Sequence, residues 1–496
     1  MDSTKKDTLV GESPVELNGS ASAAPSSTDV EAEFRAAVTE YVPGTKLEKR
    51  LVRKVDIFMV PTLWFMCVLA YVDRNNIGNA RAAGMATDLG LTDSNYSMLI
   101  SIFFIGYLIY EIPSNLILSR CPPSWYLPGL MVAWGILVAG MSQVKNYHAI
   151  LICRFFLGLI EAGFMPGVMY LMSCWYKKDE IGKRFSIFFS ALCIAGAVSG
   201  LLSGAIISGL EGRRGMAGWR WLFLLEGVIT VGFAAMCKFI LPDYPAITQR
   251  LTPEERQIAV VRILHDKQAN ASHATKKLKP LQAFFAALVD LRTYFFMALY
   301  LLDNGCATIS YFIPTVLKDM GYAGTLAQWM TVPIWIVGTF FLVVVPLSSD
   351  RLQDRRWHIV FGFAVAFVSG IIIVTVKHNT AARYAFICFY ISGVYSAFPL
   401  ILTWGSETMA LPAEKRAVAI AAVNAVGNLA AIYGSYMWPS KDAPDYTRGF
   451  TAMVGMCGGA ALLAALMPVA FKFLPEFKTK AERELEAIEG RVVDDN

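Results

Sequence analysis

The apolar positions of this chain gather in twelve long blocks that are separated by polar stretches. Each block is close to the roughly 20 residues that an α-helix needs to cross a bilayer. The first six blocks cover residues 55–79, 96–118, 124–143, 147–173, 184–208 and 219–241, and the last six cover 286–313, 326–346, 358–376, 382–404, 416–437 and 450–473. The pattern predicts an all-α membrane protein with twelve transmembrane helices. A large soluble core is the alternative, and the long uninterrupted apolar blocks argue against it.

The polar stretches divide the chain into five regions. Residues 1–44 are rich in Ser, Ala, Thr and Glu and have no apolar core, which predicts a disordered tail and no signal peptide. Residues 45–242 and 284–475 are expected to form two six-helix halves, with a basic linker at 243–283 and a charged tail at 476–496. Two such halves joined by a linker are the layout of transporters built from pseudo-repeats.

Lys and Arg residues in the short loops predict the orientation in the membrane. Basic residues cluster before the first span, after the fourth, in the linker, and after the eighth and tenth spans. The remaining loops hold only scattered cations, with a local exception at Arg213 and Arg214. The distribution places both termini and the linker in the cytoplasm. We expect a multi-pass protein of the plasma membrane that works as a monomer in the lipid bilayer.

The amino-acid composition agrees with a membrane protein and excludes several kinds of function. Of the 496 residues, 55% are hydrophobic and only 17% are charged, and the net charge of +5 is too small to indicate a nucleic-acid partner. The nine cysteines are scattered without CxxC spacing, so neither a disulfide framework nor a metal site is expected. The sequence contains no HExxH, Walker A or nucleophile-elbow pattern. We therefore expect neither an enzyme nor an ATP-driven pump, and no cofactor other than a proton gradient.

Few ionisable side chains lie within the predicted spans, where a charge is costly and marks a candidate functional site. They are Asp73 and Arg74 in the first span, Arg154 and Glu161 in the fourth, Asp303 in the seventh and, nearer the ends, Glu111, Glu226 and Glu407. No histidine lies well inside a span, so any proton carrier is expected to be a carboxylate. The roles of Asp303 and Glu407 stay open, and a structural role is expected for Glu226.

Helix geometry relates the four charges of the first and fourth spans. Arg154 lies seven residues, or roughly 10 Å, into the fourth span, and Glu161 lies two turns further along the same face. Asp73 is therefore expected to pair with Arg154 at similar depth, which leaves Arg74 and Glu161 to face a central cavity. When an anionic substrate binds Arg74, protonation of Glu161 or Asp73 would restore the charge balance. A purely structural Asp73–Arg154 ion pair is the alternative.

Polar neighbours complete the candidate substrate site. Tyr71 and Asn76 lie close to Arg74 in the sequence, and Asn424 and Asn428 share one face of the eleventh span because they are four residues apart. Amides can hydrogen-bond a carboxylate or a heteroaromatic ring without a charge cost. The asparagines could equally well form hydrogen bonds between helices. For Tyr71 the alternative is packing in the protein core.

A charged loop follows the eighth span. It reads Ser348-Ser349-Asp350-Arg351 and then Asp354-Arg355-Arg356, at the place that Pro113-Ser114-Asn115 takes in the first half. Asp350, Arg351 and Arg355 are expected to form a conformational clamp that holds helix ends together in one state. A simple topology anchor is the alternative.

Together these residues resemble the major facilitator superfamily. The loop after the eighth span is similar to its Gly-x-x-x-Asp-Arg-x-x-x-Arg signature, with Ser348 or Ser349 near the place of the glycine. The Pro-Ser-Asn form of the first loop, with Tyr107, Glu111 and the Asp73-Arg74-x-Asn76 element, resembles the anion:cation symporter branch. Within that branch, residues 73–80 look most like fungal nicotinic-acid permeases and less like allantoate permeases.

The resemblance covers residues 45–475 and carries implications about function. It implies that Arg74 binds a substrate carboxylate, that Asp73 and Glu161 handle protons, and that Arg154 supports them. The sequence departs from many fungal relatives after Trp404, where Gly405-Ser406-Glu407 replaces asparagines. The expected function is proton-coupled transport of a small organic carboxylate, with nicotinate or a derivative as the first candidate. An exporter of a fungal secondary metabolite and a permease for allantoate, pantothenate or another organic anion are the alternatives.

Overall fold

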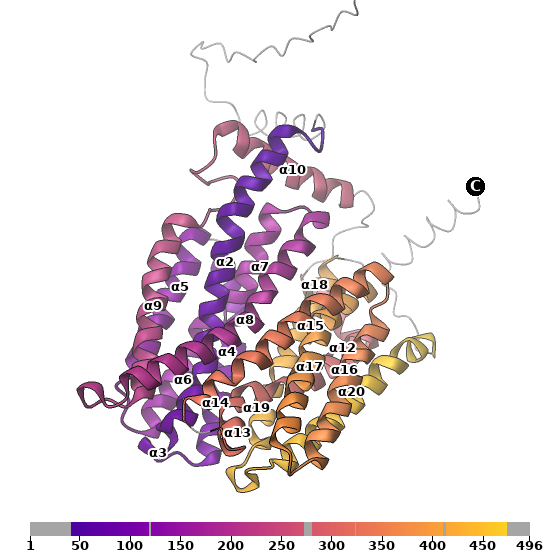
Figure 1. The fold of residues 1–496 in the computed structure, drawn as a ribbon. Helices are drawn as coiled ribbons and strands as arrows, with labels where there is room; N and C mark the ends of the chain where they lie inside the picture. Colours follow the sequence, from indigo (N-terminus) through magenta and orange to yellow (C-terminus); the bar gives the residue numbers. More distant parts are fainter. Residues whose placement is uncertain (1–40, 119–120, 272–279, 323, 410–412, 474–496) are drawn as a thin grey trace, which may run out of the picture.

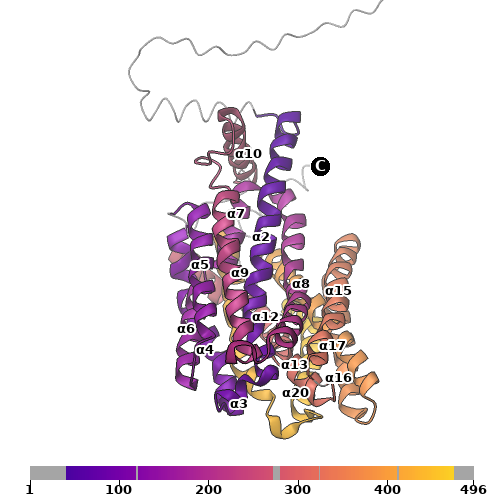
Figure 2. The same cartoon turned by 60° about the vertical axis from the view of Figure 1, so that its left-hand side comes forward.

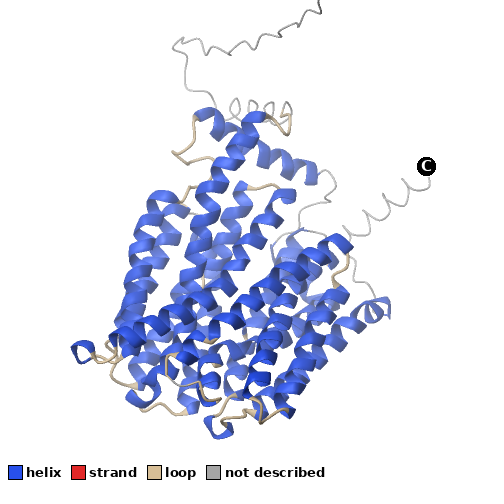
Figure 3. Cartoon of the chain, in the orientation of Figure 1, coloured by secondary structure: helices blue, strands red, loops and turns tan. Residues whose placement is uncertain are grey.

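The computed structural model describes residues 41–118, 121–271, 280–322, 324–409 and 413–473. Every regular element in these residues is helical, and none is a strand (Figure 3). The two halves of the chain lie side by side, and the linker helix α10 (Pro253–Ala271) lies beyond one end of the N-terminal half (Figures 1 and 2). The predicted tails at 1–44 and 476–496 fall outside the described residues, except for residues 41–44.

The N-terminal half contains six long helical segments in chain order. They are α2 (Lys46–Ala80), α4 (Asp93–Leu118), α5 (Pro123–Met141), α6 (Tyr147–Glu161) continued by α7 (Phe164–Trp175), α8 (Lys178–Leu210) and α9 (Gly218–Ile240). Short turns η1 (Arg81–Met85), α3 (Ala86–Asp88) and η2 (Arg213–Gly215) join some of them. The fourth predicted span is thus broken at Ala162 and Gly163. A Cβ atom on Gly163 would lie 1.6 Å from the Ser114 hydroxyl, so the glycine at this break lets the fourth span touch α4.

The C-terminal half repeats this arrangement with more breaks. Its elements are α11 (Pro280–Val289), α12 (Leu291–Ala307), η3 (Thr308–Tyr311), α13 (Ile313–Asp319), α14 (Leu326–Trp329), α15 (Thr331–Leu352), α16 (Arg356–Thr375), α17 (Thr380–Thr408), α18 (Ala413–Asn428), α19 (Ala430–Gly434), η4 (Ser435–Met437), η5 (Ser440–Asp442) and α20 (Thr447–Phe473). The seventh predicted span begins with a bend of 75° between α11 and α12. Asp290 lies at this bend and caps α12 through the Arg292 backbone N–H.

Among the described residues, ten helices are long and apolar enough to cross a membrane, and eleven if the bent pair is one span. The 26-residue α4 takes the place of the remaining predicted span. Many large apolar side chains are exposed on the outer surface of the bundle, including Ile109, Phe156, Phe239 and Leu462. An apolar outer surface is what a bilayer requires of a helical bundle.

The two halves touch mainly at the end of the bundle opposite α10, called the closed end here. There the Tyr96 hydroxyl donates to the Tyr311 carbonyl at 3.0 Å, and the Ser97 hydroxyl donates to the Ser435 carbonyl at 2.7 Å. The Ser440 backbone N–H donates to Asp93 at 2.7 Å. Nearer the α10 end, called the linker end, the described residues have one further hydrogen bond between the halves, from Asn424 to Glu111 at 3.4 Å. The halves are therefore joined at the closed end and only weakly tied at the linker end.

The helix α10 is fastened to the N-terminal half by a buried charge network. Arg262 donates to Glu48 at 3.0 Å, to the Trp175 carbonyl at 3.1 Å and to Glu180. Lys177 also pairs with Glu48, at 2.7 Å. Burial alone would lower the pKa of the Arg262 guanidinium, but its carboxylate partner Glu180 holds that pKa above its ordinary value. The network makes α10 part of the N-terminal half.

Two glycines allow α4 and α6, the helices that flank the candidate site, to pack closely where they cross. A Cβ atom on Gly158 would lie 1.9 Å from the Phe103 carbonyl oxygen, and one on Gly106 would lie 2.4 Å from the Phe155 carbonyl oxygen. Neither approach is possible for a real side chain. The two backbones therefore touch without intervening side chains, as close helix pairs in membranes do.

We expect Gly158→Ala to destabilise the protein, because the added methyl group must push α6 away from α4. Overpacking of this kind typically costs about 1–3 kcal/mol. Thermal unfolding of the purified protein measures the effect. Gly129→Ala in α5 is the matched control, since a Cβ atom there meets no atom within 4 Å. Equal melting temperatures for the two variants would contradict this packing.

Candidate functional site

Arg74 and Glu161 form a buried ion pair between α2 and α6. The Arg74 Nη2 and Nε atoms donate to the same Glu161 oxygen, at 2.5 and 3.1 Å. Only 7% of Arg74 and 2% of Glu161 is exposed. Both side chains were expected to face a central cavity. The structure pairs them with each other, because Arg74 on α2 points toward α6.

Aromatic rings surround the Arg74 guanidinium. Its central carbon lies 4.7 Å from the Tyr71 ring centre, 5.1 Å from Phe103, 5.3 Å from Tyr107 and 6.0 Å from Phe104. These rings come from α2 and α4, so two helices build the box. The ring faces attract the cation and exclude water from it. A guanidinium in such a box binds a planar carboxylate strongly, because low polarity strengthens charge-assisted hydrogen bonds.

Asp73 faces away from this box. One of its oxygens accepts hydrogen bonds from the Trp134 indole at 3.2 Å and the Thr230 hydroxyl at 3.0 Å. Consecutive residues on an α-helix point about 100° apart, so Asp73 meets α5 and α9 while Arg74 meets α6. The predicted pairing of Asp73 with Arg154 is therefore wrong. The other Asp73 oxygen is buried and has no hydrogen-bond partner in the described part of the chain.

Arg154 contacts α4 and makes no ion pair with Asp73. Its Nε atom donates to the Leu99 carbonyl at 3.4 Å, and its guanidinium lies 5.0 Å from the Phe103 ring centre. It has no ion pair with any described carboxylate. Phe103 thus contacts two guanidinium groups, those of Arg74 and Arg154. Arg154 remains a buried positive charge close to the Arg74–Glu161 pair.

The candidate amides lie in two places. Asn76 is fully buried, and neither atom of its amide has a partner among the described residues. Asn424 donates to Glu111, as described above, whereas Asn428 is half-buried one turn further along α18. Glu111 follows Tyr107 by one helical turn on α4. Asn424 and Glu111 therefore lie toward the linker end of the Arg74 box, and Asn76 lies toward the closed end.

Two more carboxylates are buried without a hydrogen-bond partner in the described residues. Asp303 in α12 and Glu226 in α9 leave both of their oxygens unbonded. Glu226 lies one turn from Thr230 on α9, so it faces the same side as the Asp73 contact. Asp303 has no hydrogen bond or ion pair with the residues of the Arg74 box in the described part of the chain. The described residues contain no cluster of three or more potential metal ligands.

The clamp candidates lie at the linker end of α15. Arg355 pairs with Asp350 and, at 3.0 Å, with Glu407 at the end of α17. Glu407, which had no assigned role, thus supplies the partner from a second helix. Arg351 is exposed and has no ion pair with a described residue. Arg355 therefore ties α15 to α17, and Arg351 stands outside that tie.

The sequence analysis named Tyr71 as a site residue but missed Phe103 and the neutral hydrogen-bond donors Trp134 and Thr230. Phe103 and Tyr107 are four residues apart on α4, a spacing that places them on one face. That spacing could have indicated an aromatic wall, had it been read against the charges of the first span. Trp134 and Thr230 left no such signal, because one indole and one hydroxyl in apolar helices are ordinary.

Comparisons with known proteins agree with this architecture. The profile of the Major Facilitator Superfamily matches residues 63–435. The MFS-type transporter cnsO of Penicillium expansum is 33% identical over 454 residues, which cover 87% of this chain and 86% of the relative. The putative tartrate transporter of Agrobacterium vitis is 28% identical over 424 residues, covering 85% and 92%.

Solved structures show the same fold at low sequence identity. The xylose transporter XylE from E. coli matches with a TM-score of 0.60 at 15% identity, over 85% of this chain and 99% of XylE. A bacterial homologue of the human lysosomal transporter Spinster, in an inward-facing and unoccupied conformation, matches with a TM-score of 0.63 at 14% identity, over 85% and 97%.

Proposed function

We propose, for a chain that belongs to the Major Facilitator Superfamily and is a membrane-embedded transporter of small molecules, that its cargo is an organic carboxylate moved together with protons. The observation that carries the proposal is the Arg74–Glu161 pair inside its aromatic box. A substrate carboxylate can take the place of Glu161 on the Arg74 guanidinium. Arg74 would then bind the substrate carboxylate in place of the Glu161 carboxylate.

Charge balance supplies the coupling to protons. Once the substrate occupies Arg74, the released Glu161 carboxylate has no cation of its own and lies in a buried site. An unpaired charge in a membrane interior is costly, so Glu161 takes up a proton. When the proton leaves, Glu161 competes again for Arg74 and expels the substrate. Asp73 is the second candidate proton carrier, because one of its oxygens has no hydrogen-bond partner among the described residues, and Arg154 supplies nearby positive charge.

The box favours a small acid with a flat ring. Tyr71, Phe103 and Tyr107 offer ring faces around the carboxylate site. In this scheme Asn424, Asn428 and Asn76 supply amides that can hydrogen-bond the substrate. Nicotinate, a carboxylate on a pyridine ring, is the first candidate. The name of the tartrate transporter relative supports organic carboxylates as a class and leaves allantoate, pantothenate and other anions as alternatives.

The proposed orientation places the linker end and both termini in the cytoplasm, at the plasma membrane. Since the halves are joined at the closed end, we infer that the structure represents the state that opens toward the cytoplasm. In this scheme the Asp350–Arg355–Glu407 tie is a clamp that holds helix ends of the C-terminal half in one state. Its strength is small per contact, because Asp350 and Glu407 are largely exposed.

Uptake into liposomes containing the purified protein tests the proposal. With an acidic outside and a neutral inside, we expect labelled nicotinate to accumulate and a protonophore to abolish the accumulation. Nicotinamide, which has the same ring and no charge, should not accumulate or compete. A panel of competing carboxylates then ranks the substrates. Equal handling of nicotinate and nicotinamide, or no pH-driven accumulation of any carboxylate in the panel, would contradict the proposal.

A further inference from the structure

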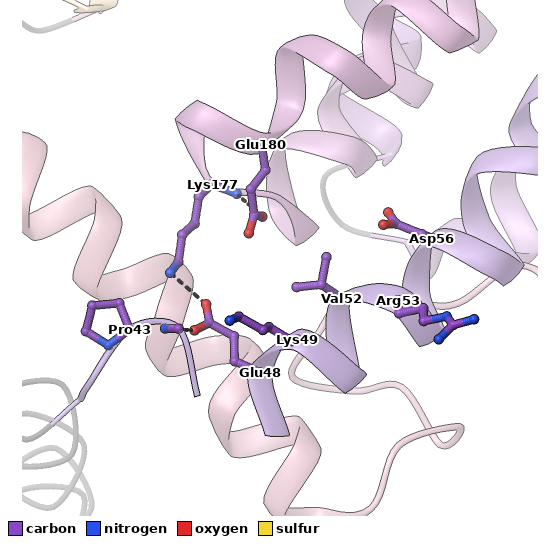
Figure 4. Close-up of a pocket in the computed structure, with 9 residues that line it drawn as sticks. Pro43, Glu48, Lys49, Val52, Arg53, Asp56, Lys177 and Glu180 are labelled. Carbon is purple, nitrogen blue, oxygen red and sulfur yellow. Dashed lines mark hydrogen bonds and ion pairs between the residues drawn. The ribbon is translucent and has the colours of Figure 1, made fainter. Parts of the chain in front are cut away.

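A cavity lined mostly by charged residues lies at the linker end of the N-terminal half, far along α2 from Arg74. It has a volume of about 400 Å³ and lies between the first turns of α2 and the turn that precedes α8 (Figure 4). Its lining includes the cations Lys49, Arg53 and Lys177 together with the acids Glu48, Asp56 and Glu180. The proposed carboxylate transport makes no use of this cavity.

The acids of the cavity are already paired. Glu48 accepts from Lys177 and Arg262, as Figure 4 shows for Lys177, and Glu180 accepts from Arg262. Asp56 is bound by Arg184 through two hydrogen bonds of 2.6 Å. Each carboxylate is therefore neutralised by a cation held in fixed geometry.

Two cations remain unused. Lys49 and Arg53 are both exposed, and neither has an ion pair with a described residue. They lie one helical turn apart on α2 and both line the cavity; in Figure 4 the Lys49 amino group extends toward Glu48, whereas the Arg53 guanidinium extends in the opposite direction. With the acids neutralised, the cavity presents a net positive charge. Its ligand chemistry is therefore that of an anion.

The outer surface of α2 continues from these cations into an apolar stripe. Ile57, Pro61 and Phe65 follow Lys49 and Arg53 at four-residue spacing, and all five are exposed. Each step of four residues turns by about 40°, so the stripe winds around the helix as it rises. Ile57 is 59% exposed and Phe65 is 51% exposed. The distance along the helix from Arg53 to Phe65 is roughly 18 Å, close to the roughly 15 Å thickness of one leaflet of the hydrocarbon core. A charged head and an apolar tail of that length describe a lipid.

We propose that this cavity and stripe bind an anionic phospholipid. The phosphate of the head group contacts Lys49 and Arg53, and one acyl chain runs along Ile57 and Phe65. Basic residues at the cytoplasmic end of a membrane helix attract anionic head groups in this way. A soluble phosphate shares the head-group chemistry but makes no use of the apolar stripe. The proposal rests on the orientation given under the proposed function, which puts the linker end at the anionic leaflet.

A lipid at this position would support the fastening of α10. The head group neutralises Lys49 and Arg53 beside Glu48, the carboxylate that holds Arg262. Without an anion, these two unpaired cations compete with Lys177 and Arg262 for that carboxylate. Binding of an anionic lipid therefore stabilises the joint between the linker and the N-terminal half.

Lipid binding to the full-length protein in detergent, measured by native mass spectrometry, tests the proposal without any transport assay. We expect phosphatidylinositol and phosphatidylserine to bind well above phosphatidylcholine. The double variant Lys49→Gln with Arg53→Gln should bind the anionic lipids roughly thirty-fold more weakly, since each basic residue at an anionic surface contributes on the order of a fivefold gain. The charge-preserving variant Lys49→Arg with Arg53→Lys should keep the affinity. Arg213→Gln with Arg214→Gln, two exposed cations at the closed end, is the matched control and should also keep it.

Three results would overturn the proposal. One is a double variant that binds anionic lipids as well as the unaltered protein. Another is an equal loss in the Arg213 and Arg214 control, which would show general charge attraction. The third is full competition by soluble inositol phosphate, which would assign the cavity to a free phosphate. Because the assay measures binding alone, failed carboxylate transport would not affect it, and a failed lipid assay would leave the transport proposal standing.

Discussion

Replacing Arg74 with alanine should abolish carboxylate transport while the protein still reaches the membrane. Arg74 is the cation at the centre of the aromatic box, and of the rings of this box Arg154 contacts only Phe103. Removing one partner of a buried, hydrogen-bonded charge pair costs about 2–5 kcal/mol. That corresponds to a loss of uptake at low substrate concentration from about thirty-fold to several thousand-fold.

Two further variants sharpen this prediction. Arg74→Lys keeps the charge but loses the planar fork of donors, so we expect partial uptake with weaker substrate binding. Arg214→Ala, in an exposed loop at the closed end, should leave uptake unchanged. Labelled uptake and surface quantification of each variant are the measurements. Undiminished uptake by a membrane-localised Arg74→Ala protein would remove Arg74 from the substrate site.

Glu161→Gln should separate transport from its driving force. Glutamine resembles the protonated form of Glu161, so the variant should still exchange labelled for unlabelled substrate. It should lose accumulation driven by a pH gradient, because no proton binds or leaves at this position. Since the variant has no carboxylate that competes for Arg74, we also expect the substrate to bind more tightly. The affinity should no longer depend on pH, because the group that takes up the proton is gone.

The matched control for Glu161→Gln is Glu254→Gln, an exposed position in the first turn of α10. It should behave as the unaltered protein in both assays. Counterflow in liposomes measures exchange, and uptake under an imposed pH gradient measures accumulation. A loss of both activities to the same degree in Glu161→Gln would indicate a structural role for Glu161.

The sequence was sufficient to predict the helical membrane architecture. A long apolar segment in a bilayer must satisfy its backbone hydrogen bonds internally, and a helix does this within one segment. The sequence also singled out Arg74 and Glu161, since charges inside apolar helices stand out from their surroundings. The helix α10 within the linker was not predicted. Its docking depends on Arg262 meeting Glu48 and Glu180, which are distant in the sequence.

The error at Asp73 has a clear physical origin. Counting residues along two helices gives the depth of each side chain but not the rotation of one helix against another. Asp73 and Arg154 lie at compatible depths, yet Asp73 turns toward Trp134 and Thr230. Neutral donors of this kind carry no charge signal in a sequence. The partner of a buried carboxylate could therefore be chosen only with the helices packed.

The central claim is that a substrate carboxylate displaces Glu161 from Arg74 and that Glu161 then takes up a proton. Calorimetric titration of the purified protein with nicotinate, or with the best carboxylate from the uptake panel, tests it directly. Repeating the titration in buffers of different ionisation enthalpy counts the protons taken up on binding. We predict close to one proton per bound carboxylate for the unaltered protein near neutral pH, and none for Glu161→Gln. Binding without proton uptake by the unaltered protein, or undiminished proton uptake by Glu161→Gln, would contradict the account.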